Sequence, residues 1–413
     1  MQQILDWIEH HLDAQISPRD IADEAGYSLW HFSRLFLSEV GMTPARYVTR
    51  RRLAHALWAI SQGESVIDAA LRYGFDTHAG FYKAFCREYG CPPTEYLRAH
   101  RAQKPRPLRL AEEEYLMLNH DTWKKALAAW GMADLPLAPA VYEPSGTVAD
   151  NVCCAGSGLI LKAYRDPVVC RRALHMAHAL HEAGLPASLP LALPDGQEML
   201  EIAGCFITLS HRLEGSPLRP ADMLSGDAHG NGHLIGCTLR QLHSALDAVE
   251  LPDLTDLPIG EHILSWALPK AKPCLPANFP ADFEERAAAL DNLPRGAIHR
   301  DPNPGNLLSL PDGRIGLIDF DLAERSVRLY DLCYASTGIL MECMDDAALR
   351  EKWPQLLQGI LDGYEASAAE REAAMTMVLG IEVICLAAFV GSEKYKRAFD
   401  FNLRVVEWLC GRK

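Results

Sequence analysis

Two neighbouring segments of the chain carry residue types suited to phosphoryl transfer. "IHRDPNPGNLL" (298–308) contains Asp301 and Asn306, and "GLIDFDLAE" (316–324) places Asp319 at the end of the following hairpin. The reaction needs a carboxylate that orients an attacking hydroxyl and accepts its proton, and ligands that hold magnesium on the phosphates. Magnesium prefers oxygen ligands and keeps several waters, so few protein ligands suffice. We therefore expect these three side chains to converge on a magnesium–nucleotide site.

The elements around this motif indicate a small α+β lobe followed by a mainly helical lobe. "VADNVCCAGSGLILKAY" (148–164) has two β-rich runs around a Gly/Ser turn, which predicts a hairpin. Helical patterns return near 168–183 and 229–249. A second strand–turn–strand pattern covers 306–320, and helical patterns then continue to the end of the chain.

The first hundred residues follow a different pattern, made of short helices that repeat. Residues 25–44 resemble residues 73–93, with Phe32 of the first copy matching Phe81 of the second. A repeat of this size indicates two helix-turn-helix units and an all-α domain. Pro44 to Ile60 would form a stiff connecting helix, so the two units can address adjacent major grooves about one helical turn (~34 Å) apart.

Residues 1–101 resemble the AraC/XylS-type DNA-binding domain, including "AALRYGFDTHAGFYKAFCREYGCPPTEYLR" (69–98). The resemblance implies a sequence-specific transcription regulator whose partner is double-stranded DNA. It places one reading helix from near Ser28 to Val40 and the other from Thr77 to Tyr89. The residues that these helices would present to DNA are Trp30, Ser33, Arg34, His78, Tyr82 and Lys83.

Several of these positions have structural alternatives. Trp30 could be partly structural, and His78 could stabilise the start of its helix. Tyr82 could pack against the backbone without contacting DNA. In the basic triplet that follows the first unit, we expect Arg50 and Arg51 to contact DNA phosphates. Its third member, Arg52, is expected to brace the connecting helix through a salt bridge.

The second half of the chain resembles the aminoglycoside phosphotransferase/choline kinase-like family, from about Leu135 to Tyr334. The resemblance implies ATP and Mg²⁺ as cofactors, with Asp301 as catalytic base and Asn306 and Asp319 as magnesium ligands. It implies that Lys162 in "LILKAY" grips the ATP phosphates. The loop expected over the phosphates lies in "EPSGTVADN" and contributes Ser145, Gly146 and Thr147.

The same resemblance assigns supporting roles. "ITLSHRLEGSPL" (207–218) would be the hinge that contacts adenine, and Asp331 would anchor the catalytic loop. His243 would be structural. For Asp321 two interpretations stay open: a second carboxylate near the metal, or a capping or solvated residue.

One departure from the family concerns the helix after the Lys162 strand. The family places a glutamate there to pair with the lysine, whereas residues 168–186 have His175 near the expected place and Glu182 near the helix end. Without that carboxylate Lys162 would be held less firmly. Catalysis and ligand sensing without turnover are therefore both compatible with the sequence.

Charge is distributed unevenly along the 413 residues, whose net charge is −14. Residues 1–104 contain twelve basic and twelve acidic residues, so the whole excess belongs to the second part. The acidic residues could attract a cationic substrate, such as an aminosugar or a choline-like amine. They could also form a solvated surface without a ligand, and we favour this second interpretation. The acidic string "MECMDD" (341–346) would lie on the substrate side or in that surface.

We expect a cytoplasmic protein with no membrane segment. Asp6, Glu9 and Asp13 interrupt any apolar N-terminal run. The longest apolar stretch, Ala373 to Val390, has Glu382 in its middle and favours a buried helix over a membrane span.

The chain is therefore predicted to be multidomain. An all-α double helix-turn-helix domain (1–102) and a linker (103–111) would precede an α+β, protein-kinase-like, two-lobed domain (112–413). Its small lobe would cover about 112–212 and its helical large lobe about 213–413.

Three functions remain open, ranked here in order. The first is a regulator that phosphorylates a small hydroxylated ligand, and the second is a regulator whose kinase fold only senses one. The third is an aminoglycoside- or choline-like kinase whose helix-turn-helix module does not read DNA. Ligand identity, operator and oligomeric state are left open.

Overall fold

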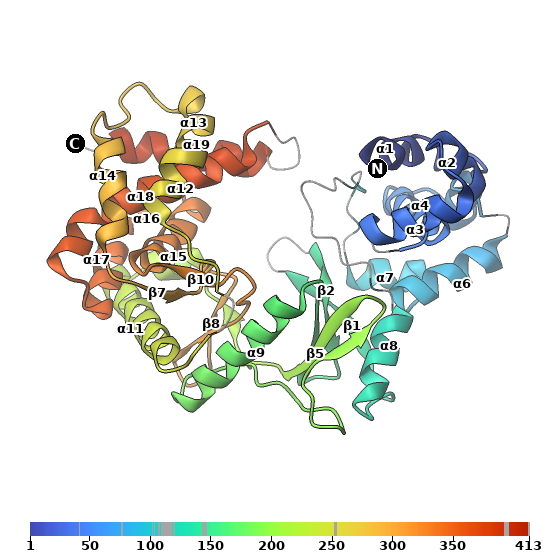
Figure 1. Cartoon of the computed structure of the whole chain (residues 1–413), viewed down its shortest axis with the longest axis horizontal. Coiled ribbons are helices and arrows are strands. Elements are labelled where there is room, and N and C mark those ends of the chain that lie inside the picture. Colours follow the sequence, from blue (N-terminus) through green and yellow to red (C-terminus); the bar gives the residue numbers. More distant parts are fainter. Residues whose placement is uncertain are drawn as a thin grey trace. The chain divides into compact units, whose positions relative to one another are not determined.

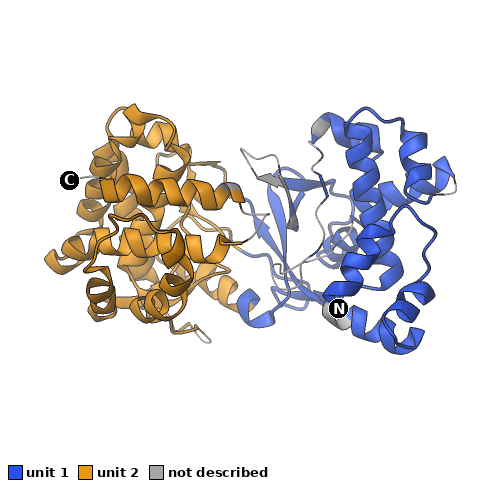
Figure 2. Cartoon of the chain, turned by 90° about the horizontal axis from the view of Figure 1, so that it is seen from above, with its two compact units in different colours: residues 1–170, 190–212 blue, residues 171–189, 213–413 orange. Residues whose placement is uncertain are grey.

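The computed structural model describes residues 1–40, 42–75, 77–100, 102, 104–105, 108, 118, 120–142, 147–251, 254–391 and 396–411. These residues form two compact units (Figure 2). Unit 1 contains residues 1–170 and 190–212, and unit 2 contains residues 171–189 and 213–413. The domain boundaries expected at 102 and 112 stay a prediction.

Unit 1 begins with helices and ends with a sheet (Figure 1). Its helices are α1 (Gln2–His10), α2 (Pro18–Glu24), α3 (Leu29–Val40), α4 (Pro44–Ser61), α5 (Val66–Arg72), α6 (His78–Tyr89), α7 (Pro93–Ala99) and α8 (His120–Ala129). Its strands are β1 (Leu137–Tyr142), β2 (Thr147–Ala155), β3 (Leu159–Tyr164), β4 (Leu200–Ile202) and β5 (Cys205–His211). They pair antiparallel in the order β1-β2-β3-β5-β4.

The two helix-turn-helix copies have separate cores of the same design. Phe32 and Phe36 of α3 are fully buried in one apolar cluster, and Phe81 and Phe85 of α6 are fully buried in another. Both pairs are four residues apart and so lie on one face of their helix. The expected core role of the repeated phenylalanines is confirmed. The opposite faces of α3 and α6 remain available to contact a partner.

The sheet of unit 1 is covered by α8, an element that the sequence did not indicate. Trp123, Ala126 and Leu127 of α8, and Trp130 directly after it, form a core with buried residues of the strands, such as Leu161. The Trp130 ring nitrogen donates to the Leu191 carbonyl at 2.9 Å, so the buried indole is satisfied. Because this core fixes α8 to the sheet, the helix belongs to the small lobe.

Helix α9 (Pro167–Glu182) runs across the boundary between the units, and unit 2 then contains short strands among many helices. The strands are β6 (Ser216–Pro217), β7 (Arg295–Ile298), β8 (Leu307–Ser309), β9 (Ile315–Leu317) and β10 (Glu324–Val327). β7 pairs with β10, and β8 lies between β6 and β9. The longer helices are α11 (Ala228–Asp247), α15 (Leu329–Glu342), α17 (Trp353–Tyr364), α18 (Ala368–Phe389) and α19 (Lys396–Gly411).

Shorter helical segments connect these elements. They are α10 (Pro220–Leu224), α12 (Ile259–His262), the π-helix η1 (Ile263–Ala267), α13 (Leu268–Ala271), the 3₁₀-helix η2 (Lys272–Cys274), α14 (Phe283–Ala289), the 3₁₀-helix η3 (Leu290–Asn292) and α16 (Ala347–Arg350). An α+β small lobe followed by a mainly helical lobe is thus confirmed.

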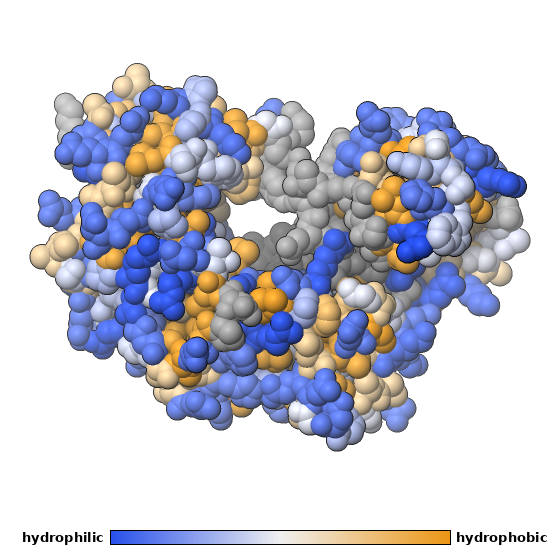
Figure 3. Space-filling model, viewed as in Figure 1, coloured by the Kyte–Doolittle hydropathy of each residue, from blue (hydrophilic) through white to orange (hydrophobic). Residues whose placement is uncertain are grey.

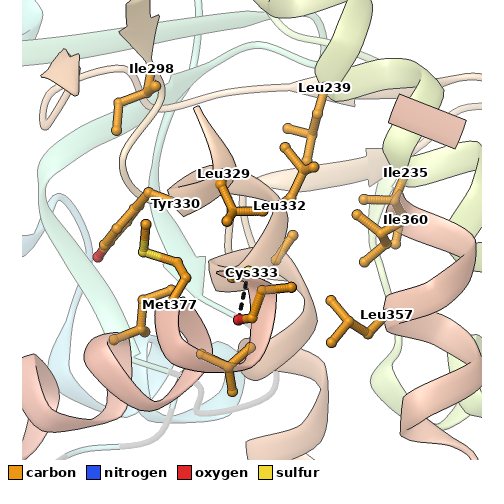
Figure 4. Close-up of a cluster of buried hydrophobic side chains, with 14 of the residues drawn as sticks. Ile235, Leu239, Ile298, Leu329, Tyr330, Leu332, Cys333, Leu357, Ile360 and Met377 are labelled. Atoms are coloured by element: carbon orange, nitrogen blue, oxygen red, sulfur yellow. Dashed lines mark hydrogen bonds between the residues drawn. The ribbon is translucent and has the colours of Figure 1, made fainter. Parts of the chain in front are cut away.

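The core of unit 2 gathers around α15, whose Leu332 and Cys333 are fully buried (Figure 4). Among its neighbours in that view are Ile235 and Leu239 of α11, Leu357 and Ile360 of α17, and Met377 of α18. The segment with Asp301 and Asn306 follows β7, whose Ile298 belongs to the same core. The motif is therefore attached directly to the most buried part of the lobe.

Helix α18 has the length and apolarity of a membrane span, but much of it lies inside unit 2. Met377, Val378 and Val383 are fully buried, which is the arrangement of a core helix. Glu382 is also buried, and burial raises the pKa of its carboxyl to about 8, so the group is neutral at pH 7.

On the face of the molecule shown in Figure 3, hydrophilic and hydrophobic residues are interspersed.

Helices α11 and α17 approach each other closely because glycines line their contact. A Cβ at Gly232 or Gly236 of α11 would overlap the carbonyl oxygen of Leu356 or Ile360. A Cβ at Gly359 or Gly363 of α17 would in turn overlap backbone of α11. The backbone of each helix occupies the space that a Cβ on the other helix would need. Glycine is therefore required at this crossing.

We expect Gly236→Ala to lower the stability of unit 2 by about 1–3 kcal/mol, because the added methyl group pushes two packed helices apart. Gly411→Ala in α19 is the matched control, because none of the described residues has an atom within 4 Å of a Cβ there. Thermal unfolding followed by circular dichroism measures both. Equal midpoints for the two variants would contradict this explanation of the glycines.

Candidate functional sites

The motif residues of unit 2 lie together at the ends of two paired strands. Asn306 donates from Nδ2 to Oδ2 of Asp301 at 3.1 Å and to the Asp301 carbonyl at 2.9 Å. The Ile318 backbone nitrogen donates to the Asn306 carbonyl at 3.1 Å, which places Asp319 beside the same loop. The Asp319 charge also acts on the Asp301 carboxyl. The structure thus brings the three predicted side chains together.

Burial is the main influence on Asp301 and raises the pKa of its carboxyl, and the nearby Asp319 charge acts in the same direction. Hydrogen bonds oppose this effect: Asn303 donates to Oδ1 at 2.9 Å, and the Tyr334 hydroxyl also bonds to the carboxyl. A half-buried carboxylate whose position is fixed by several donors suits a group that must accept a proton at a defined point.

Sequence reasoning missed two of these donors. Asn303 lies inside the quoted motif, but nothing in its spacing separated it from its neighbours. Tyr334 lies three residues after Asp331 on α15, so the two share one face of the helix. That spacing was the available signal.

The loop that carries Asp301 is anchored by Asp331 at the start of α15. The Asp331 carboxylate is fully buried and accepts from the backbone nitrogens of His299 at 2.7 Å and Arg300 at 2.9 Å. His243 of α11 bonds to the same carboxylate through Nε2 at 3.0 Å. The anchoring role expected for Asp331, and the structural role expected for His243, are confirmed.

Electrostatics stabilise this anchor. Burial alone would raise the pKa of Asp331, but the hydrogen bond from His243 and the nearby histidines hold it below its ordinary value. A carboxylate only accepts, so His243 Nε2 carries a proton. Its other nitrogen, Nδ1, lies 2.9 Å from the Tyr364 hydroxyl, so the ring is held from both sides.

Backbone strain is concentrated at the ends of the site. Arg300 has φ +74° and Asp319 has φ +70°. Residues other than glycine rarely adopt this left-handed region of backbone conformation. Arg300 is held by an ion pair with Glu324 at 3.1 Å and lies over the Tyr330 ring at 4.4 Å. A positive φ costs a non-glycine residue about 1–3 kcal/mol of conformational free energy, so it persists only where surrounding contacts hold the backbone there.

The donor set fits a magnesium ion that is shared with phosphates. The amide nitrogen of Asn306 donates to Asp301, which leaves the Asn306 amide oxygen available to a metal ion. In the described part of the chain, no group of three or more His, Cys, Asp or Glu is arranged to hold a metal. Two oxygen ligands completed by phosphate and water are the usual arrangement for magnesium.

Arg172 is a further residue that the sequence did not single out. Its side chain is buried in unit 2 and donates from Nη2 to the backbone carbonyl of Asp321 at 2.6 Å. The bond fixes the backbone two residues after Asp319. Asp321 is thus held through its main chain, and the two interpretations of its carboxylate stay open.

In unit 1, Lys162 lies in the middle of β3. It is paired across the sheet with Val152 of β2 and Thr208 of β5, and its Nζ lies 5.2 Å from the Tyr164 ring. Thr147 begins β2 and pairs with Tyr142. Ser145 and Gly146 lie outside the described residues. On α9, His175 is exposed.

The reading helix α3 presents an exposed aromatic–basic pair. The Trp30 side chain is 68% exposed, and the Arg34 guanidinium lies 4.8 Å from the centre of its ring. Ser33 is half-buried between them along the helix. An indole left in solvent has no packing role, which favours the DNA-contact interpretation of Trp30.

The reading helix α6 presents a similar surface. The Thr77 side chain caps the helix by accepting from the Gly80 nitrogen at 3.0 Å, so His78 is not needed for the helix start. The exposed His78 ring lies 4.5 Å from the half-buried Tyr82 ring. Lys83 is exposed on the next turn.

Arg50 and Arg51, which we expect to contact DNA phosphates, both have carboxylate partners inside unit 1. Their contact with phosphates stays a prediction that this pairing does not favour. Arg51 is 7% exposed and pairs with Glu9 through Nη2 at 2.9 Å. Arg50 is 15% exposed and pairs through Nε with Glu88 of α6 at 3.1 Å. Both positions fall on faces of α4 that pack inside unit 1, so their charges are used within the fold.

Arg52 stabilises the position of α4, as expected. Its main partners are backbone carbonyl groups, whereas we expected a salt bridge to a carboxylate. Its Nε donates to the Leu12 carbonyl at 3.0 Å, and Nη2 donates to the Ala14 carbonyl. These bonds attach the connecting helix to the segment after α1.

We expect Asp331→Ala to destabilise unit 2 by about 3–5 kcal/mol, because it leaves His243 and two buried backbone donors without their acceptor. Asp282→Ala is the control: this exposed residue pairs with Arg286 at i,i+4, a contact worth about 0.3–0.5 kcal/mol. Thermal unfolding measures both. Because the folded-state pKa of Asp331 is depressed, its contribution is present above about pH 4 and is lost as pH falls through that pKa. A difference from wild type that persists unchanged at acid pH would contradict the assignment.

Two family models match the chain. Residues 21–99 match a helix-turn-helix domain, and residues 145–375 match the phosphotransferase enzyme family.

Relatives resemble the N-terminal part. The uncharacterized HTH-type transcriptional regulator YbfP of Bacillus subtilis is 37% identical over 124 residues, which are 30% of this chain and 41% of that protein. The HTH-type transcriptional activator AarP of Providencia stuartii is 39% identical over 97 residues, which are 23% of this chain and 72% of that protein. The chain thus spans less than half the length of YbfP.

Solved structures resemble the C-terminal part. A microcompartment-associated aminopropanol kinase has a TM-score of 0.50 and 18% identity, covering 70% of this chain and 94% of that one. Wild-type aminoglycoside 2'-phosphotransferase-IIIa, solved with GDP, has a TM-score of 0.50 and 12% identity, covering 70% and 99%. At these identities the likeness concerns the fold. The chain belongs to the phosphotransferase enzyme family through residues 145–375 and carries an AraC-type helix-turn-helix domain at residues 21–99.

Proposed function

We propose that the protein is a cytoplasmic transcription regulator whose C-terminal domain transfers the γ-phosphoryl group of ATP to a hydroxyl of a small molecule. The observation that carries the catalytic part is the cluster of Asp301, Asn306 and Asp319 on a loop anchored by Asp331. A fold that served only as a scaffold would not need two half-buried carboxylates close to each other, because their repulsion and partial desolvation cost energy.

In the proposed reaction, Asp301 orients the substrate hydroxyl and accepts its proton as the oxygen attacks the γ-phosphorus. The bond between the γ-phosphorus and the bridging oxygen breaks, and ADP leaves. Asn306 and Asp319 would hold magnesium, which neutralises charge on the phosphates when it is bound. Lys162 and the loop with Ser145, Gly146 and Thr147 would hold the phosphates from the small lobe.

A second candidate is a regulator whose kinase domain binds ligands without turnover. It is motivated by the helix after β3, where His175 stands near the place of the family's glutamate. The two functions differ in their products: only the first generates ADP and a phosphorylated ligand.

We infer that the ligand carries a hydroxyl group and that cationic amino alcohols and aminosugars are the compounds to test first. The acidic segment gives them limited support. Asp345 is 74% exposed and pairs with Arg404, as expected of a solvated surface. Glu342 is exposed as well, although partial burial raises the pKa of its carboxyl.

We expect Asp301→Asn to reduce ADP release by roughly 10²–10⁴-fold, because the substrate hydroxyl loses its proton acceptor. Asp312→Asn, at the exposed tip between β8 and β9, removes the same charge away from the site and leaves turnover unchanged. The assay is a coupled ADP measurement over amino alcohols, aminoglycosides and other hydroxylated metabolites, with ATP and with GTP. Nucleotide binding without ADP release from any compound would favour the sensor.

For the DNA half, we expect the protein to select a defined motif from random duplexes. Arg34→Ala weakens binding by about 1–3 kcal/mol and relaxes sequence preference at one position, because Arg34 is exposed on α3. Arg98→Ala on α7 removes the same charge outside the reading helices and leaves the preference intact. Fluorescence anisotropy at increasing salt measures affinity, which falls with salt because phosphate contacts release counterions. A flat salt response, or no selected motif, would argue for the kinase alone.

A further inference from the structure

Helix α8 connects the DNA-reading module to the sheet within unit 1. One face of α8, with Trp123 and Leu127, lies in the core of the sheet. At its first turn, the His120 ring lies directly against Gly90, which ends α6 with φ +81°. A Cβ at Gly90 would fall 2.6 Å from His120 Nδ1, so this contact is close. Any shift of α8 relative to α6 must therefore change this contact.

The same junction contains a cavity of about 100 Å³. Its lining from the helix-turn-helix module is Arg50, Glu88, Tyr89 and Tyr96, and its lining from the sheet includes Pro139, Ala149, Val152 and Cys153. The Arg50–Glu88 ion pair is largely enclosed, with the two side chains 15% and 11% exposed. An enclosed ion pair beside unfilled space can be rearranged at lower cost than a close-packed core.

The sheet side of the cavity is also the hairpin expected to bind phosphates. Val152 lines the cavity from β2 and is the direct cross-strand partner of Lys162 on β3. The β1–β2 pairing is irregular between Pro139 and Val141, and Pro139 lines the cavity as well. A bulge is a point at which a hairpin can bend. A displacement of Lys162 that moves β2 would thus reach the cavity wall through Val152.

On the other side of the cavity, the signal would reach DNA through a single rigid element. Helix α6 carries His78 and Lys83 on its exposed surface and Glu88 and Tyr89 at its C-terminal end, in the junction. Because Phe81 and Phe85 fix α6 in its own core, the helix moves with its whole helix-turn-helix unit.

We propose that nucleotide occupancy of the small lobe is transmitted to the second DNA-reading helix through this junction, so that nucleotide and operator each change the other's affinity. The route is direct packing of α8 and the β1–β2 hairpin against α6, and it does not depend on the proline-containing linker. The inference rests on the proposed function, because both ligands must bind. Linkage requires the two effects to be equal in size.

The test uses the full chain, a duplex recovered by selection from random DNA, and Mg²⁺ with the non-hydrolysable analogue AMP-PNP. Anisotropy measures the duplex Kd with and without saturating AMP-PNP, and calorimetry measures the AMP-PNP Kd with and without duplex. We expect both constants to change by the same factor, at least about five-fold.

Two junction variants and one control test the route. His120→Ala removes the ring against Gly90, and Glu88→Gln breaks the enclosed ion pair; both should bring the coupling factor toward one while each ligand still binds. Lys125→Ala, on the exposed face of α8, should retain wild-type coupling. Thermal melts identify folded variants, and either junction variant alone is sufficient if the other does not fold.

The failures are distinguishable. If both ligands bind wild-type protein and neither affects the other, the coupling is overturned while the proposed function stands. If coupling persists in a folded His120→Ala or Glu88→Gln protein, the route is overturned. If AMP-PNP does not bind, or no duplex is selected, the proposed function fails and the coupling fails with it.

Discussion

The carboxylate of Asp331 is the contact on which the geometry of the candidate kinase site depends. It lies at the first turn of α15, inside the core of unit 2, and accepts from the two backbone nitrogens that precede Asp301. A buried carboxylate is costly unless its oxygens are satisfied, and here two amides and one imidazole satisfy them. The same bonds fix the loop, so the energy that stabilises the ionised group also positions the candidate base.

This anchor explains how the site can hold strained backbone. Arg300 and Asp319 both have positive φ, at opposite ends of the segment that brings Asp301, Asn306 and Asp319 together. Relaxing either residue would break pairing of the short strands around them, β7 with β10 and β8 with β9. The glycine crossing of α11 and α17 belongs to the same framework, because α11 supplies His243 and α17 supplies Tyr364 behind the anchor.

The DNA-reading half uses buried charge in a comparable way. Glu9 of α1 receives Arg51 and His55 of α4, while Glu88 of α6 receives Arg50. Burial would raise the pKa of Glu9, but hydrogen bonds from His55 and Arg51 keep it below its ordinary value. The connecting helix is thereby attached to both helix-turn-helix copies by arginines that look like DNA ligands in the sequence. Fewer basic side chains are then left for phosphate contacts, and the exposed residues of α3 and α6 gain importance.

Local patterns in the sequence predicted the candidate catalytic triplet, the two helix-turn-helix copies, the paired phenylalanines and the order of the lobes. The phenylalanine pairs depend on a spacing of four residues, which the period of a helix converts directly into a shared face. Tertiary structure alone decided the roles of Arg50 and Arg51, the donation of Tyr334 to Asp301, the position of Arg172 and the contact of α8 with Gly90. The partners in these contacts are mostly distant in the chain, as for Glu9 and Arg51, whose positions differ by 42. A charge looks the same in the sequence whether it faces water or a buried partner, and only the packed fold determines which of the two it meets.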